Sequence, residues 1–276
     1  MNKSPTRPGV SLHQMAMYGF MVFSAILSLF PFAWMLISST NTTADINQGK
    51  FTFGSALLEN VAKLTQQVDL PVIFWNTAKI AIIATALTLL VASLAGYGFE
   101  VYRSRLRERV YQLLLLTMMI PFAALMIPLF TMMAKAGLLD NHWAVILPAI
   151  PSVYIIFYFR QCTKAFPKDL LDAARVDGVS EWKIFAFVYF PVMRSTYAAA
   201  FIITFMANWN NYLWPLIVLQ SSDMKTINLV LSSLASAYFP DFGVVMVGTI
   251  LATLPTIVVF FTMQKQFVQG MLGSVK

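Results

Sequence analysis

Three asparagines and three aromatic residues lie close together in the fifth apolar stretch of the chain, and side chains of these two types can together bind a sugar. An amide exchanges hydrogen bonds with hydroxyl groups, and an aromatic ring covers the apolar C–H face of a pyranose. The sequence therefore indicates the lining of a translocation pathway, formed by Asn208, Trp209, Asn210, Asn211, Tyr212 and Trp214. The same residues also fit a second interpretation, an interfacial aromatic belt with amide hydrogen bonds between helices.

A second segment with chemical character runs from Phe166 to Pro191, where the residues predict two short helices. Pro167 favours the first turn of one helix, and Gly178 favours the left-handed residue that follows its last turn. Ser180 can cap a second helix, which Pro191 ends. We expect this helical loop to face water or another protein.

The first of these helices has a surface that combines acidic residues with small side chains. Asp169 and Asp172 are three residues apart and share a face with Ala173, and the small side chains of Ala173 and Ala174 let another protein approach closely. We therefore predict a docking surface. The second helix carries aromatic side chains that must pack on the apolar stretches of the chain, on a lipid bilayer or on a partner. These are Trp182, Phe185 and Tyr189.

Several kinds of chemistry are missing from the sequence. No Asp or Glu lies within an apolar stretch, where such a charge usually marks ion coupling. The chain has no G-x-x-x-x-G-K-[ST] loop for ATP phosphates. Its two histidines, His13 and His142, fall at opposite faces of the predicted topology, and Cys162 is its one cysteine. We therefore predict no metal site, no cofactor and no catalytic group in this chain, and a transport role must draw its free energy from another protein.

The composition indicates that most of the chain lies within a lipid bilayer. Of its 276 residues, 58% are hydrophobic and 11% charged, against about 45–50% and about 25% in soluble domains. Six apolar stretches reach the roughly 20 residues that a helix needs to cross the hydrocarbon core, and strict period-two alternation is absent. We predict an all-α, multi-pass membrane protein with a single domain over 1–276. Its six spans lie near 15–38, 72–98, 110–134, 143–162, 196–220 and 241–263, and a loop over 163–195 joins the fourth to the fifth.

The distribution of basic residues gives the predicted orientation. With both termini in the cytoplasm, 14 of the 19 Lys and Arg residues lie on the cytoplasmic side, together with the loop over 163–195. Four arginines occupy one short loop between spans, where lipid headgroups, and not nucleic acid, are the natural neighbours. They are Arg103, Arg105, Arg107 and Arg109.

The acidic helix resembles the signature of a known family, the membrane permeases of ABC importers, in which E-A-A is followed after three residues by G. The match is Asp172-Ala173-Ala174-Arg175-Val176-Asp177-Gly178, with Asp172 in place of the family's longer Glu. The likeness extends over nearly the whole chain and is closest to the carbohydrate-importer branch of the maltose type. The segments that carry this likeness are Pro31-Phe32-Ala33-Trp34-Met35, Trp209–Pro215 and Gln264–Gly270.

The resemblance implies a non-catalytic subunit in the bacterial inner membrane that imports a sugar or an oligosaccharide. It implies a second similar permease, two cytoplasmic ATPase subunits that bind ATP and Mg, and an extracytoplasmic solute-binding protein as partners. The loop between the fourth and fifth spans would form coupling helices seated in a cleft of the ATPase. The residues assigned to this coupling are Asp169, Asp172, Ala173, Ala174, Asp177, Gly178, Glu181, Trp182 and Phe185.

Three alternatives stay open beside this interpretation. One is an ABC permease for another solute, such as a polyol, a glycerol phosphate or an oligopeptide. Another is an ATP-independent channel or carrier, against which the lack of carboxylates in the predicted spans counts. The third is a membrane-embedded enzyme, which would need a nucleophile and base or a metal cluster at one depth.

Overall fold

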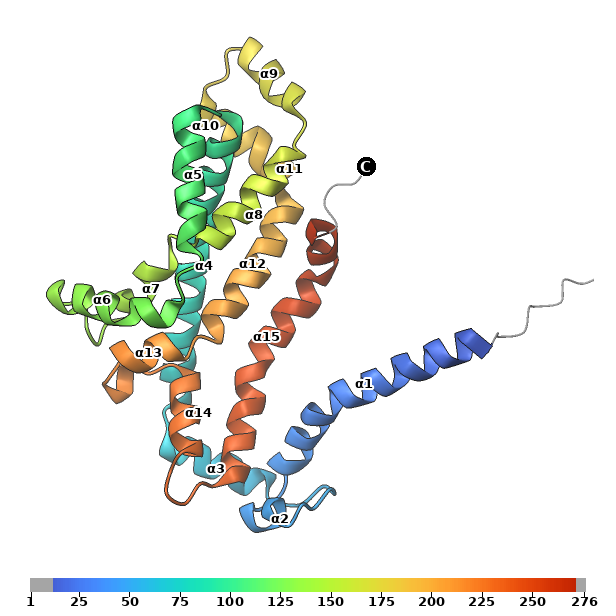
Figure 1. Ribbon diagram of the computed structural model, residues 1–276. Coiled ribbons are helices and arrows are strands. Elements are labelled where there is room, and N and C mark those ends of the chain that lie inside the picture. The colour runs from blue at the N-terminus through green and yellow to red at the C-terminus, as the bar shows by residue number, and fades with distance from the viewer. Residues whose placement is uncertain (1–11, 272–276) are drawn as a thin grey trace, which may run out of the picture. The chain divides into compact units, whose positions relative to one another are not determined.

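The computed structural model describes residues 12–271, with the side chains of residues 14–268, and this part of the chain is helical without any strand (Figure 1). Its helices divide into two compact units. The first unit runs to Gln67 and includes Leu234–Leu251, and the second comprises Val68–Ser233 and the residues from Ala252 onward. The basic residues Lys3, Arg7 and Lys276, which contribute to the predicted orientation, lie outside the described residues, as does the side chain of His13.

Polar side chains in the first unit hold the end of its longest helix. Asn60 is buried, and its amide donates to the carbonyl oxygens of Ser39 (2.9 Å), the last residue of that helix, and of Asn41 (3.0 Å), two residues beyond it. Lys63 lies 3.2 Å from a carboxylate oxygen of Asp241. These contacts join the helices of the unit, which are α1 (Leu12–Ser39), α2 (Thr43–Asn47), α3 (Leu57–Gln67) and the start of α15 (Phe242–Met271).

The second unit holds the remaining helices. Most of them are α-helical, with one π-helical and one 3-10 segment. In chain order they are α4 (Leu70–Val101), α5 (Arg105–Thr117), α6 (Phe122–Lys135), α7 (His142–Ala149), α8 (Val153–Lys164), α9 (Lys168–Val176), α10 (Glu181–Ile184), the π-helix η1 (Phe185–Tyr189), α11 (Phe190–Val192), α12 (Arg194–Trp209), α13 (Leu213–Val218), the 3-10 helix η2 (Ser222–Met224), α14 (Ile227–Ala235, which runs into the first unit) and the rest of α15.

Helix α4 is the axis of the second unit, and α8 and α12 pack along it (Figure 1). Asp69 caps the start of α4 by accepting a hydrogen bond from the backbone N–H of Val72 at 3.2 Å. Gly96 lets α8 approach closely, since a Cβ atom at this position would lie 2.7 Å from Phe159 Cβ and 2.8 Å from the backbone nitrogen of Arg160. The tight contact between α4 and α8 therefore depends on the missing side chain.

Four helical segments of the described chain are long and apolar enough to cross a bilayer, and two bent helix pairs raise the number to as many as six. The third predicted span, 110–134, is one of these pairs, because α5 and α6 meet at an angle of 101°. Pro121 precedes α6 and has no N–H with which to continue the helix. The fifth predicted span, 196–220, is also interrupted, since the helix breaks between Trp209 and Leu213.

The second predicted span differs at its end, because α4 continues three residues beyond the predicted bound of 98. Glu100 therefore lies within the helix, where it is buried. The sequence had indicated no carboxylate within a span, and the longer helix adds one at its last turn.

Candidate functional site

The predicted docking surface is exposed on α9. The side chains of Asp169, Asp172 and Ala173 are exposed, and Val176 is 88% exposed. On the opposite face Leu171 is buried in an aromatic cluster. The helix is therefore amphipathic, with its apolar face held by the second unit and its acidic face open to a partner.

The turn after α9 takes the conformation that Gly178 predicts. Gly178 has a φ of +73°, and its N–H donates to the carbonyl of Arg175 at 3.0 Å. The N–H of Val179 donates to the carbonyl of Ala174 at 3.0 Å, which completes a Schellman motif. Asp177 is the exposed residue before this turn. The last carbonyls of α9 are thus paired within the loop, and the turn directs the chain back toward α10.

A charged tether connects the loop to the end of α4. The Nε of Arg175 donates to Glu181 at 2.8 Å, and its Nη1 donates to Asp172 at 3.2 Å. Glu181 also accepts hydrogen bonds from the hydroxyls of Tyr97, at 3.4 Å, and Tyr102. The carboxylate of Glu181 raises the pKa of Arg175, so the guanidinium stays charged. Glu181, one of the predicted coupling residues, is therefore bound to other residues of this chain.

The aromatic residues of the second helix behave in two different ways. Phe185 packs edge-on against Tyr97 and stacks on Tyr189, and Tyr189 pairs through its hydroxyl with Thr163 at 2.7 Å. Trp182, in contrast, is 74% exposed. Phe185 and Tyr189 therefore hold the loop to the helices, whereas Trp182 is available to a partner. The second helix ends at Val192, one residue after the predicted stop.

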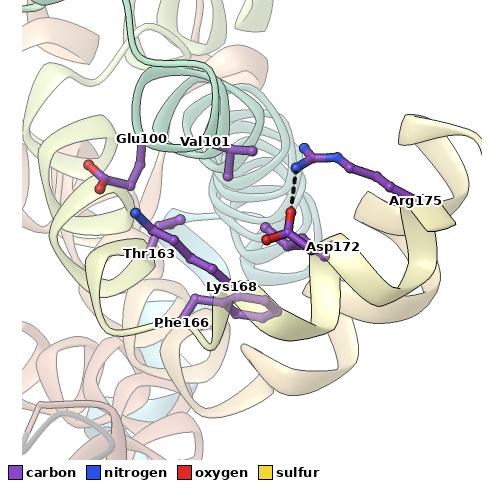
Figure 2. A pocket seen from close by; sticks show the side chains of 8 residues that line it. Glu100, Val101, Thr163, Phe166, Lys168, Asp172 and Arg175 are labelled. Carbon is purple, nitrogen blue, oxygen red and sulfur yellow. Dashed lines mark hydrogen bonds and ion pairs between the residues drawn. The ribbon is translucent and has the colours of Figure 1, made fainter.

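A polar cavity of about 80 Å³ lies between α9 and the ends of α4 and α8. Figure 2 shows Glu100 and Lys168 extending toward each other across it, with Asp172 paired to Arg175 at the other side. The cavity separates the acidic helix from two buried charged side chains that the sequence did not predict, Glu100 and Arg160.

The four arginines between α4 and the body of α5 are all exposed. Arg103 donates to Glu100 at 2.7 Å, and Arg107 donates to the backbone carbonyl of Tyr102. The lipid headgroups expected beside these four arginines stay a prediction.

The amide and aromatic residues of the fifth span do not form one surface. The indole N–H of Trp209 donates to the carbonyl of Ala252 at 3.0 Å, and that of Trp214 donates to the carbonyl of Ala144 at 2.8 Å. Both rings are buried and fasten neighbouring helices together. This arrangement leaves neither ring face free for a sugar or for the membrane interface.

The exposed part of this group lies at the break between α12 and α13. Asn210 is exposed, Tyr212 is 37% exposed, and Asn211 is half-buried. Asn208 is half-buried and donates to the hydroxyl of Thr85 at 3.3 Å. Within this group, Tyr212 is thus the aromatic residue with an accessible ring.

We predict that Glu181→Gln loosens the loop. The amide keeps the size of the side chain but loses the charge that binds Arg175, and for these partly exposed groups we expect a cost of about 0.5–1 kcal/mol. Trypsin cleavage after Arg175 should become about two- to fivefold faster. Asp172→Asn is the matched control, because its pair with Arg175 is more exposed. Equal cleavage of the Glu181 variant and the wild type would contradict the tether.

The fold is that of a helical membrane protein, with four to six candidate spans in the described residues. The model of the family described as "binding-protein-dependent transport system inner membrane component" matches residues 88–273, and the chain belongs to this family. Its membership confirms the predicted resemblance to ABC importer permeases and the predicted inner-membrane location.

Two relatives are similar over almost their whole length. The lactose transport system permease protein LacG of Rhizobium radiobacter is 66% identical over 265 residues, which cover 96% of this chain and 97% of that protein. The arabinooligosaccharides transport system permease protein AraQ of Bacillus subtilis is 35% identical over 280 residues, covering 98% of each chain. Among solved structures, a bacterial ABC transporter involved in import of the acidic polysaccharide alginate matches with a TM-score of 0.81 and 20% identity, over 96% of this chain and 100% of that chain.

Proposed function

We propose that this chain is one permease subunit of an ATP-driven importer for a sugar or an oligosaccharide, most plainly a disaccharide such as lactose. The observation that carries the substrate class is the 66% identity to a lactose permease across 96% of the chain. In this proposal the whole chain acts as one transmembrane domain with both termini in the cytoplasm. A second, similar permease forms the other half of the pathway.

The coupling part of the proposal rests on the loop over 163–195. Its exposed acidic and apolar side chains would dock in a cleft of a cytoplasmic ATPase, and ATP and Mg would bind to the ATPase subunits. When ATP draws these subunits together, α9 would be displaced and the spans would rock between inward-facing and outward-facing states. The side chains that offer themselves for docking are Asp169, Asp172, Asp177, Val176 and Trp182.

Copurification from the native membrane tests the assembly. A tagged chain extracted in mild detergent should bring down an ATPase subunit and a second permease, and the complex should gain a solute-binding protein when solute is present. Recovery of the chain alone, together with solute flux through it in liposomes without ATP, would favour a channel or carrier instead.

Uptake measurements test the solute. Cells that lack the gene and regain it on a plasmid should recover uptake of labelled lactose or a related oligosaccharide. A polyol, glycerol 3-phosphate and an oligopeptide serve as the other solutes of the panel. Restored uptake of one of these three in place of the sugar would replace the substrate class and leave the importer mechanism intact.

For the pathway we predict that Tyr212→Ala lowers sugar uptake about fivefold, because it removes the accessible ring at the break between α12 and α13. Tyr212→Phe should keep most of the uptake, since the ring face remains and only the contact of its hydroxyl with Ser232 (3.0 Å) is lost. The effect is measured as sugar uptake at equal amounts of protein in the membrane. Tyr154→Ala on α8 is the control, because Tyr154 is also an exposed tyrosine. Unchanged uptake in Tyr212→Ala would show that this ring does not line the pathway.

A further inference from the structure

Arg160 is a buried cation at the point where three helices of the second unit meet. It lies on α8 and is 3% exposed. Its Nη2 donates to Glu108 Oε2 on α5 at 2.6 Å, and its Nη1 donates to Glu108 Oε1 at 3.3 Å. Its Nε lies 3.5 Å from Glu100 Oε2 on α4. One guanidinium therefore contacts carboxylates from two other helices.

The surroundings of Arg160 fix its position further. The guanidinium carbon lies 3.8 Å from the centre of the Tyr111 ring on α5, a cation–π contact. Glu100, which is 5% exposed, also accepts a hydrogen bond from Arg103 at 2.7 Å. Two arginines and two glutamates thus form a cluster without net charge, and Arg160 is its most buried cation.

Stability alone does not account for this cluster. Desolvation of a buried ion pair about cancels its attraction, and well-packed apolar residues commonly replace such pairs without loss. The contact between α4 and α8 is already made by close packing over Gly96. Charged groups buried between membrane helices are costly and commonly serve a function.

The position of the cluster indicates what that function is. Arg160 lies in the last turns of α8, which ends at Lys164, and α9 begins four residues later at Lys168. Across the polar cavity of Figure 2, Glu100 faces the first residue of α9. Helix α9 is joined to α8 along the chain and to α4 through the tether of Arg175 and Glu181. The contacts of Arg160 with Glu100 and Glu108 form a clamp that connects this end of α8 by charge to both α4 and α5.

We propose that Arg160 is a positioning residue for coupling, which joins the ends of α4, α5 and α8 into one body so that movement of α9 is passed to all three helices. This inference rests on the proposed function, since it needs an ATPase to displace α9. Without the clamp, α8 moves while α5 lags, and ATP is hydrolysed without complete rearrangement of the spans.

The test compares uptake with ATP hydrolysis in the reconstituted complex. At equal amounts of assembled complex, Arg160→Gln should lower sugar uptake per ATP hydrolysed about tenfold. Glu108→Gln should have the same effect, and the double variant should be no worse than either single variant. Arg160→Lys, which keeps the charge, should restore part of the ratio. Arg109→Gln, an exposed arginine beside Glu108, is the matched control and should behave as the wild type.

A distance measurement separates coupling from a structural role. Spin labels at Leu106 on α5 and Lys164 on α8, both exposed, are placed in a Cys162→Ser background. In the wild type the distance between the labels should stay constant when ATP is added, because the two helices move together. In Arg160→Gln it should change or broaden on ATP addition.

The outcomes are distinct. An unchanged ratio of uptake to hydrolysis in Arg160→Gln, or uptake that falls only in proportion to assembled complex, would overturn the inference while leaving the proposed function in place. A wild-type complex that shows no ATP-dependent uptake of sugar would instead refute the proposed function.

Discussion

Gly178→Val is expected to leave the protein folded in the membrane and to abolish coupled transport. The φ of +73° at this position places the residue in the left-handed region, where a β-branched side chain is strained. The cost is about 1–2 kcal/mol, and relief of this strain would break the Schellman turn that ends α9. A Cβ atom at Gly178 would meet nothing within 4 Å, so no clash with the helices is added.

Uptake and solute-stimulated ATP hydrolysis measure this effect, and both should fall about tenfold or more. Gly178→Asn is the graded variant, because asparagine tolerates the left-handed conformation, and it should keep most activity. Gly49→Val is the matched control, since Gly49 has a φ of +71° in equally open space but lies in the first unit. Normal solute-stimulated hydrolysis in Gly178→Val would refute the role of this turn.

Gly96→Val should have the largest effect on folding. A Cβ atom at Gly96 would lie 2.7 Å from Phe159 Cβ and 2.8 Å from the backbone nitrogen of Arg160, so α4 and α8 would have to separate. We expect a loss of about 3 kcal/mol or more, and of most of the monodisperse protein in detergent. Separation of these helices would also pull Arg160 away from Glu100.

Gly98 provides the control two residues further along the same helix. Its Cβ atom would meet nothing within 4 Å, and its φ is not positive. Gly98→Ala should therefore be neutral or stabilise the protein by about 0.4–1 kcal/mol. Size-exclusion profiles and thermal unfolding of the two variants make the comparison, and a Gly96→Val protein as stable as Gly98→Ala would show that the helices can yield at this contact.

The sequence predicted those features whose cause is local. Apolar stretches of about 20 residues are visible as composition, and four of them appear as continuous membrane-length segments. The turn at Gly178 was predictable because only glycine takes this conformation at little cost. The exposed acidic face of α9 followed from the spacing of Asp169 and Asp172.

Features that depend on distant segments were not predictable in the same way. The third span was predicted as one segment over 110–134, whereas the angle of 101° between α5 and α6 depends on what each helix packs against. The aromatic residues of the fifth span looked alike in sequence, yet Trp209 and Trp214 are buried because Ala252 and Ala144 offer carbonyls to their N–H groups.

The clamp at Arg160 was also missed, although the sequence contained a signal for it. Arg160 follows a long apolar run, where a cation needs a partner, and Glu100 comes two residues after the predicted end of its span. The partner on α5, Glu108, was hidden among four arginines that together suggested a lipid-facing loop. Only the three-dimensional arrangement shows that Arg160 and Glu100 are buried together, whereas the four arginines are exposed.

The helix break at Asn210–Tyr212 has a consequence for how such a protein can diverge. The buried tryptophans on either side of it hold the framework, whereas the exposed residues between them carry little packing. Substitutions at Asn210 or Tyr212 therefore cost little stability, while substitutions at Trp209 or Trp214 would leave cavities in the core. Under the proposed function, a gene can therefore change its solute through substitutions at these few positions without passing through an unfolded intermediate.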